Sequence, residues 1–186
     1  PLSKQPELKH AAISIERVAL PYRVIALRAA DSGAADEEHI LRWRERLSPC
    51  LAEFDYAALT LAGRDHPLVM LSIASAQPLP ENALDSLITL LDMQDSTAYR
   101  DPSRDIIKLA RIDSASDRLQ GVLLAGETAA ADWLREQVAS QNPLGDLRRW
   151  LFAPIAQPPV AMPAAGRTVC NCFGISETQI NELLRA

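Results

Sequence analysis

Cysteine and basic side chains are both scarce in this sequence of 186 residues. Its three cysteines are an odd number, which gives no disulfide framework and favours a reducing compartment. Lysine and arginine number 19 against 24 acidic residues, and the net charge of -5 is spread along the chain without a basic stripe. The sequence therefore has no basic patch of the kind that binds nucleic acids or anionic membranes. We expect a cytoplasmic protein with neither as a partner.

Long apolar runs and catalytic signatures are missing as well. No stretch approaches the roughly 20 apolar residues of a membrane span, and no charged and apolar leader precedes a cleavage site. The sequence contains no G-x-S-x-G, G-x-G-x-x-G or Walker pattern. Metal-ligand spacing is absent among the histidines, which we expect to be ordinary surface side chains: His10, His39 and His66. These absences predict that the chain holds no complete active site.

Strand and helix patterns follow one another along the chain. Apolar runs and period-two alternation predict strands over residues 12–18, 22–27, 56–62, 68–73, 106–112 and 119–124. Apolar residues at helical spacing predict helices over residues 36–47, 84–91, 130–138 and 143–152. The polar residues 113–118 predict a hairpin, and the Thr128 hydroxyl is expected to cap the helix after it. The sequence thus favours an α+β fold: a small mixed or antiparallel sheet, helices packed on one face, and a C-terminal cysteine loop–helix unit.

Composition divides the chain into four parts. Residues 1–19 begin as a polar segment without a core of its own, whereas residues 20–152 carry the pattern of one α/β domain. Residues 153–166 hold four of the thirteen prolines, so we expect a stiff, extended Pro/Ala linker. Residues 167–186 are a new unit, a cysteine loop followed by a helix that is cut short at the end of the sequence.

The segment Val169-Cys170-Asn171-Cys172-Phe173-Gly174 carries the most specific chemistry. Two thiolates one residue apart can face one metal centre if the backbone curls, and Gly174 permits such a curl. The start of the next helix, with Ser176 as a candidate cap, offers free N–H groups to anionic sulfur. This is a reasonable half of an iron–sulfur site. The alternative is an incidental surface pair, because C-x-C spacing alone is weakly specific. Cys50 lies among apolar residues of the sequence and is expected to be a buried small side chain.

The stretch VCNCFGISETQI resembles the N-terminal half of the [2Fe-2S] domain of the bacterioferritin-associated ferredoxin family. The resemblance implies that Cys170 and Cys172 are two of the four cluster ligands. In that family a C-x-x-C pair further downstream supplies the other two, and this sequence has no such pair. The chain alone therefore offers half a ligand set.

The N-terminal stretch SKQPELKHAAISIE resembles the last segment of the molybdopterin-dinucleotide-binding domain of bacterial nitrate reductases. The resemblance implies that Lys9 binds the molybdopterin guanine dinucleotide cofactor, with Gln5 a weaker candidate. An ammonium group is a compact point charge that suits phosphate or pterin oxygens. Residues 1–19 would then be the tail of that domain. The alternative is that Lys4, Lys9 and His10 are simply solvated charges.

The run DPSRDIIKLARIDSASDRLQGVLLAGETAAADWLREQV resembles the small C-terminal domain of rubredoxin-reductase-like flavoproteins. The resemblance implies a docking or interface module to which no catalytic residue carries over. Taken in order, the three resemblances imply the C-terminal part of a bacterial assimilatory nitrate reductase. The large subunit of nitrite reductase shares only the last two of these modules.

The expected function is therefore electron transfer and donor docking within a molybdenum enzyme that reduces nitrate to nitrite. The implied cofactors are molybdopterin guanine dinucleotide and a [2Fe-2S] cluster in the parent enzyme, and a [4Fe-4S] cluster elsewhere in it is an open alternative. The implied partners are the rest of the parent polypeptide and a flavoprotein or ferredoxin donor. Two alternatives stay open: a non-catalytic docking module for such a donor, or the corresponding part of an NADH-dependent nitrite reductase.

Overall fold

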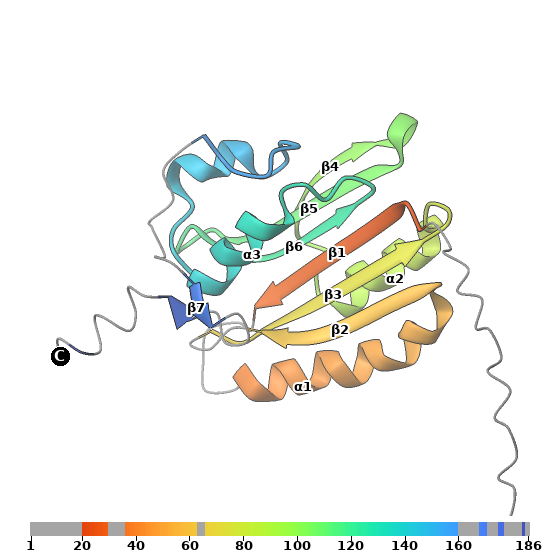
Figure 1. Ribbon diagram of the computed structural model, residues 1–186, viewed down its shortest axis with the longest axis horizontal. Coiled ribbons are helices and arrows are strands. Elements are labelled where there is room, and N and C mark those ends of the chain that lie inside the picture. The colour runs from red at the N-terminus through yellow and green to blue at the C-terminus, as the bar shows by residue number, and fades with distance from the viewer. Residues whose placement is uncertain are drawn as a thin grey trace, which may run out of the picture.

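Six antiparallel strands form the sheet around which the protein is built (Figure 1). The computed structural model describes residues 20–29, 36–62, 66–159, 168–170, 175–176 and 184. The strands are β1 (Tyr22–Ala29), β2 (Tyr56–Ala62), β3 (Leu68–Ser75), β4 (Thr97–Asp101), β5 (Ile106–Asp113) and β6 (Arg118–Ala125). Their order across the sheet is β2-β3-β1-β6-β5-β4. The expected α+β class and the antiparallel option for the sheet are confirmed.

The first strand, β1, lies at the centre of the sheet and joins its two halves. It pairs with β3 on one side, from Tyr22 opposite Ser75, and with β6 on the other, from Val24 opposite Ala125. The two halves are the pair β2–β3 and the meander β4–β5–β6. A central strand is covered on both faces, which explains why β1 is apolar almost throughout.

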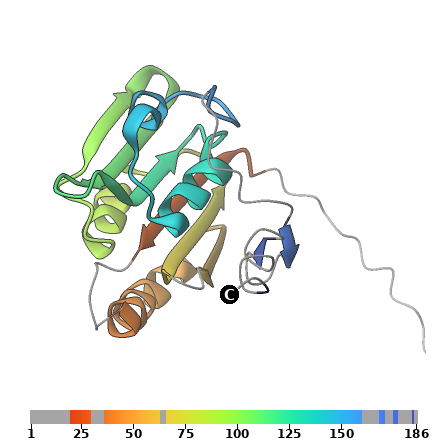
Figure 2. The same cartoon turned by 90° about the vertical axis from the view of Figure 1, so that its left-hand side faces the viewer.

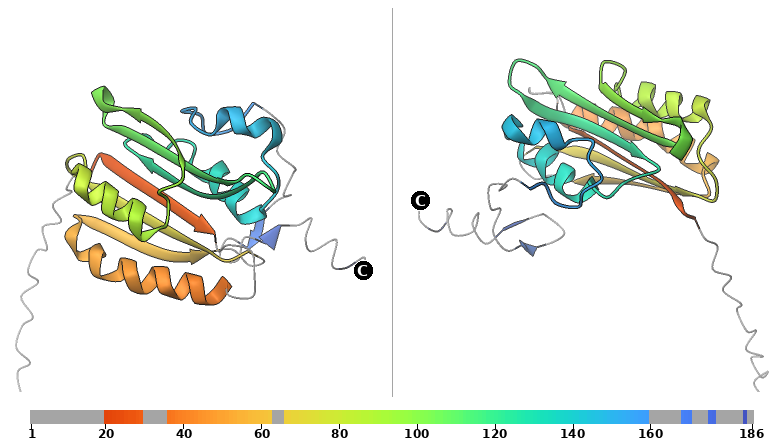
Figure 3. Two further views of the ribbon diagram at one scale, coloured as in Figure 1. Left: turned by 180° about the vertical axis from the view of Figure 1, so that it is seen from behind. Right: turned by 90° about the horizontal axis from the view of Figure 1, so that it is seen from above.

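Helices cover both faces of the sheet, so the expectation of helices on one face is wrong. Helices α1 (Asp36–Leu47) and α2 (Glu81–Leu90) pack on one face around Trp43, Leu47 and Leu87. Helix α3 (Ala131–Ser140) packs on the other face through Trp133 and Leu134. Figure 2 separates α1 from α3 across the sheet, and the reverse view in Figure 3 brings α2 to the front.

The physical reason for two covered faces lies in consecutive strand residues. Ala26 and Leu27 of β1 are each 1% exposed although they point to opposite faces, and Leu123 and Leu124 of β6 behave in the same way. A sheet whose strands carry apolar residues on both faces needs a covering layer on each face. Two short 3-10 helices add to these layers, η1 (Ser48–Glu53) and η3 (Gly145–Trp150), whereas η2 (Pro102–Arg104) connects β4 to β5.

The start of α3 differs from the sequence-based expectation. Ala130 occupies the cap position without a side-chain hydrogen bond, so the predicted Thr128 hydroxyl cap is wrong. Glu127 instead accepts a hydrogen bond from the Ala129 backbone N–H at 2.6 Å, while the Thr128 carbonyl accepts from Ala131 N–H at 3.0 Å. A carboxylate ahead of a helix is also favoured by the helix dipole.

The ends of the chain are described only in part. The predicted strand over residues 12–18 lies outside the described residues, as does most of the predicted helix after Ser176, of which Leu184 is 79% exposed. No helix within the described ranges has the length and apolar character needed to cross a membrane.

Candidate functional site

The cysteine segment forms a short antiparallel hairpin. Strand β7 (Thr168–Cys170) pairs with β8 (Ile175–Ser176), and the register places Cys170 opposite Ile175 and Thr168 opposite Ser176. A register irregularity lies between Thr168 and Cys170. Cys170 is therefore the last paired residue of β7, and the chain must reverse direction between Cys170 and Ile175.

Three of the four predicted site residues lie outside the described part of the chain. Cys172 belongs to residues 171–174, which connect β7 to β8, whereas Gln5 and Lys9 precede the first described residue, Leu20. The structure thus places Cys170 at the base of the hairpin connection. The approach of the two thiols to each other and the cofactor contact of Lys9 stay predictions.

The donor set of the hairpin fits half of an iron–sulfur site. A cysteine at the last paired position and a second one in the connection are two residues from which thiolates could be offered to one metal centre. A [2Fe-2S] cluster takes four such donors, and the remaining cysteine of the chain is Cys50. Within the described ranges, no cluster of three or more His, Cys, Asp or Glu side chains could hold a metal ion.

Two further sequence expectations concern Cys50 and the histidines. Cys50 is half-buried in η1, with its thiol donating to the Arg46 carbonyl oxygen at 3.9 Å, so it is less buried than predicted. His66 is exposed, as predicted for a surface side chain. The side chains of His10 and His39 are not among those described.

A buried ion pair holds the segment before the Pro/Ala linker against the sheet. Lys108 in β5 is 2% exposed on the face that α3 covers, and its ammonium group pairs with Glu127. The same ammonium donates to the Phe152 carbonyl oxygen at 2.9 Å. A buried cation is tolerated where an opposite charge and hydrogen-bond acceptors replace water. Lys108 thus joins strand β5 to Phe152, at the end of the α/β domain.

Two aromatic contacts fix the same segment. The Phe152 ring stacks on Tyr99 of β4, with ring centroids 6.3 Å apart and an angle of 26° between the planes. The indole N–H of Trp133 in α3 donates to the Ile155 carbonyl oxygen at 3.2 Å. Together with Lys108, these contacts hold the end of the domain at Phe152 and the first residues of the predicted linker, up to Ile155, on the α3 face.

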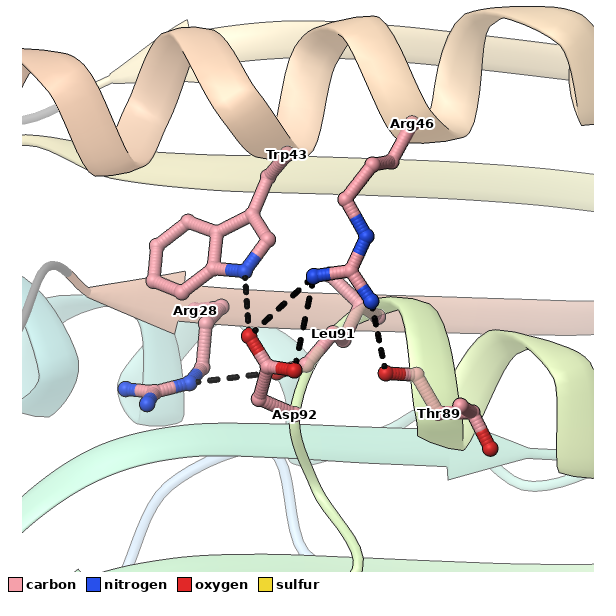
Figure 4. A network of polar contacts seen from close by, with 6 residues as sticks. All are labelled: Arg28, Trp43, Arg46, Thr89, Leu91 and Asp92. Carbon is pink, nitrogen blue, oxygen red and sulfur yellow. Dashed lines mark hydrogen bonds and ion pairs between the residues drawn. The ribbon is translucent and has the colours of Figure 1, made fainter.

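A second buried cation, Arg28, lies on the opposite face of the sheet (Figure 4). It is 1% exposed, and its guanidinium carbon lies 4.9 Å from the centroid of the Trp43 ring, within cation–π range. Its Nε donates to the Leu91 carbonyl oxygen at 3.2 Å, and a terminal nitrogen donates to the Ala29 carbonyl oxygen at 2.8 Å. Arg28 therefore links β1 to α1 and to the end of α2.

Asp92 completes the connection between α1 and α2. It follows α2 in a left-handed conformation, with φ of 53°. Its carboxylate accepts hydrogen bonds from the Trp43 indole N–H at 3.0 Å and from Arg46 at 3.4 Å, and Arg46 also donates to the Thr89 carbonyl oxygen at 3.3 Å (Figure 4). The last carbonyls of a helix lack intrahelical partners. The contacts of Asp92 and Arg46 thus bind two helices together, which is a structural role.

Gly121 makes room for Arg28. A Cβ atom on Gly121 in β6 would lie 2.9 Å from the Leu27 carbonyl oxygen, and 3.0 Å from both Arg28 Cδ and Met93 Sδ. A side chain at this position would push against the backbone of β1 and the stem of the arginine. The glycine is therefore part of the Arg28 site.

Three titratable groups are perturbed by their surroundings. Burial raises the pKa of Tyr22, and the nearby Asp105 carboxylate raises it further. The hydroxyl of Tyr22 donates to the Asp105 carbonyl oxygen at 3.1 Å. Hydrogen bonds from Ala76 N–H and the Ser75 hydroxyl lower the pKa of Asp55, and a hydrogen bond from Ser116 is the main cause that lowers the pKa of Asp113. These carboxylates order turns, as Asp side chains commonly do.

Sequence reasoning did not single out Arg28 or Lys108. The available signal was a cation inside an otherwise apolar strand, as in YRVIALRA and IIKLARID. No family model, curated protein or solved structure matches this chain.

Proposed function

We propose that this chain is the C-terminal portion of a molybdenum-dependent assimilatory nitrate reductase. Nitrate reduction needs an external source of electrons, and the proposed part played by this chain is electron transfer and donor docking. Cys170 and Cys172 would provide two of four thiolates to a [2Fe-2S] cluster, which accepts and passes single electrons when bound. Lys9, with Gln5 as the weaker candidate, would contact the molybdopterin guanine dinucleotide cofactor.

The observation that carries the proposal is the pairing of Cys170 with Ile175. Because this pairing reverses the chain directly after Cys170, it favours a cysteine-bearing connection over an extended segment with two unrelated thiols. The spacing of the cysteines and the glycine in the connection agree with the same site.

The anchored segment before the linker supports a positioning role for the α/β domain. Lys108 holds the Phe152 carbonyl and Trp133 holds the Ile155 carbonyl, so the residues that lead toward the hairpin begin at a fixed place. Electron transfer between centres depends on their separation, and a stiff proline-containing linker from a fixed point restricts that separation. The domain would thus limit where the hairpin can go.

The proposal is tested in the parent polypeptide, purified under anaerobic conditions. We expect Cys170→Ser and Cys172→Ser each to abolish the visible absorption and paramagnetic signal of a [2Fe-2S] cluster and to lower iron content. Cys50→Ser is the matched control and should leave all three measurements unchanged. A parent sequence without a further thiol pair and without a molybdopterin domain would contradict the proposal. Unchanged iron content and absorption in both hairpin variants would show that Cys170 and Cys172 bind no cluster, and would favour the docking role for this chain.

A further inference from the structure

The two outer strands of the sheet differ in how they are protected. Strand β2 has the sequence YAALTLA, with no charged residue, proline or glycine over its seven residues. Strand β4, at the other edge, has the sequence TAYRD, with two charged residues over five. Charged side chains and short length are devices that prevent an edge strand from pairing with another chain. Strand β4 has both, and β2 has neither.

Strand β2 also presents a regular edge. It pairs with β3 without interruption from Tyr56 opposite Ala74 to Ala62 opposite Leu68, with no bulge to twist the strand away. Among the described strands, β3 is its one neighbour, so no described strand pairs with the outer side of β2. Helix α1 runs beside this edge and packs on one face of the sheet (Figure 1). Two large apolar side chains on β2 are more than half exposed, Tyr56 at 55% and Leu61 at 52%.

We infer that β2 pairs with β2 of a second copy of this chain, antiparallel and about a two-fold axis at Leu59. Leu59 is the middle residue of the strand, so this axis pairs all seven residues of one copy with all seven of the other. A two-fold contact is isologous, which means that the same strand must suit itself. The six-stranded sheets of the two copies would become continuous.

The side chains of β2 are complementary to themselves in this register. Tyr56 would lie opposite Ala62 of the second copy, and Leu61 opposite Ala57, so each large exposed side chain meets a small one. Ala57 and Leu59 face α1, whereas Ala62 faces the α3 side. One large side chain would therefore be covered on each face of the sheet. Directly opposed cross-strand pairs are the unit that stabilises such a ladder.

Charge supports a second copy over a charged partner strand. Since β2 has no ionisable side chain apart from the Tyr56 phenol, two copies bring no like charges into opposition, and a charged partner segment would find no opposite charge on the strand itself. Seven residues span roughly 24 Å, so the ladder belongs to the small class of interfaces. We expect a reversible dimer with a dissociation constant of roughly micromolar or weaker.

Sedimentation velocity of the full chain over a wide range of concentrations tests the inference. We expect a monomer–dimer equilibrium that is at least about tenfold weaker in Thr60→Lys, because a charge is placed on the exposed edge. Leu61→Lys is a second variant at an exposed position and should act alike. Thr97→Lys, at an exposed position of the other edge strand, is the matched control and should leave the dissociation constant unchanged.

A wild-type chain that stays monomeric at every concentration would overturn the inference. A dimer that persists in both β2 variants, or that Thr97→Lys weakens equally, would also overturn it. The register has its own test, since Leu59→Cys should form an inter-chain disulfide across the axis, beyond the level seen with the native cysteines. A dimer in which Leu59→Cys gives no additional crosslinking would exclude the axis at Leu59.

Discussion

Arg28 and Lys108 are buried cations on opposite faces of one sheet, and their surroundings differ. Arg28 lies under α1 and α2, stacks on Trp43 and donates to backbone carbonyls. Lys108 lies under the α3 face, pairs with a carboxylate and donates to a carbonyl of the segment that leaves the domain. The planar guanidinium can serve several carbonyls and a ring at once, whereas the ammonium is a point charge.

The comparison shows that the position of a buried cation in the sheet determines which elements it connects. Arg28 contacts residues from four separate parts of the core: β1, α1, the end of α2, and the Gln120 carbonyl of β6 at 3.4 Å. Lys108 connects the sheet to Glu127 and Phe152, near the boundary of the domain. We therefore expect the loss of Arg28 to weaken the whole domain, and the loss of Lys108 to release chiefly its C-terminal segment.

The largest effect is expected for Arg28→Met. This change leaves the Leu91 and Ala29 carbonyls without a donor in the core and should lower the free energy of unfolding by about 3 kcal/mol. Urea denaturation measures it. Arg23→Met, at an exposed position of the same strand, is the matched control and should stay within about 0.5 kcal/mol of wild type. Equal losses in the two variants would contradict a special role for Arg28.

A smaller and more local effect is expected for Lys108→Met. Glu127 keeps its hydrogen bond from Ala129 and is partly exposed, so it can be rehydrated, and the free energy of unfolding should fall by about 2 kcal/mol. Residues 153–159 should also become more susceptible to limited proteolysis. Glu127→Gln leaves the buried Lys108 ammonium without an opposite charge and should lower the free energy of unfolding at least as much as Lys108→Met does. Cleavage that is equally fast in wild type and Lys108→Met would show that Lys108 does not anchor this segment.

The same comparison explains what the sequence predicted and what it did not. Strand and helix positions followed from apolar spacing, and β2 was found over the same residues that the structure shows. The number of covered faces was wrong, because short apolar runs do not reveal whether one or both parities are buried. On a sheet covered on one face, Lys108 would have been an ordinary solvated side chain. Because only one covered face was predicted, the burial of Lys108 was not predicted.

Strand β4 shows a second limit of the sequence. Four of its five residues are exposed, and TAYRD has neither an apolar run nor clear alternation, so no strand was predicted there. The strand exists because its backbone completes hydrogen bonds along β5 from Thr97 opposite Ala110 to Asp101 opposite Ile106. Tertiary pairing, not local propensity, sets such an edge. The cysteine hairpin is a related case, because a loop was expected there and the strands β7 and β8, which pair through Cys170 and Ile175, were not predicted.

The smallest predicted effect concerns Tyr22, a titratable residue of β1. It distinguishes the role of Tyr22 from that of Arg28 in the same strand. The raised pKa of Tyr22 means that the folded state holds the phenolic proton more tightly than the unfolded state does. The stability from the neutral hydroxyl is thus fully present below the unfolded value of about 10 and is lost as pH rises through the raised pKa. Tyr22→Phe should reduce the alkaline loss of stability, whereas Arg28→Met should lower stability at neutral and alkaline pH alike, because guanidinium groups stay protonated. Urea denaturation of both variants at neutral and alkaline pH provides the measurement. An unchanged pH dependence in Tyr22→Phe would assign the alkaline transition to another group.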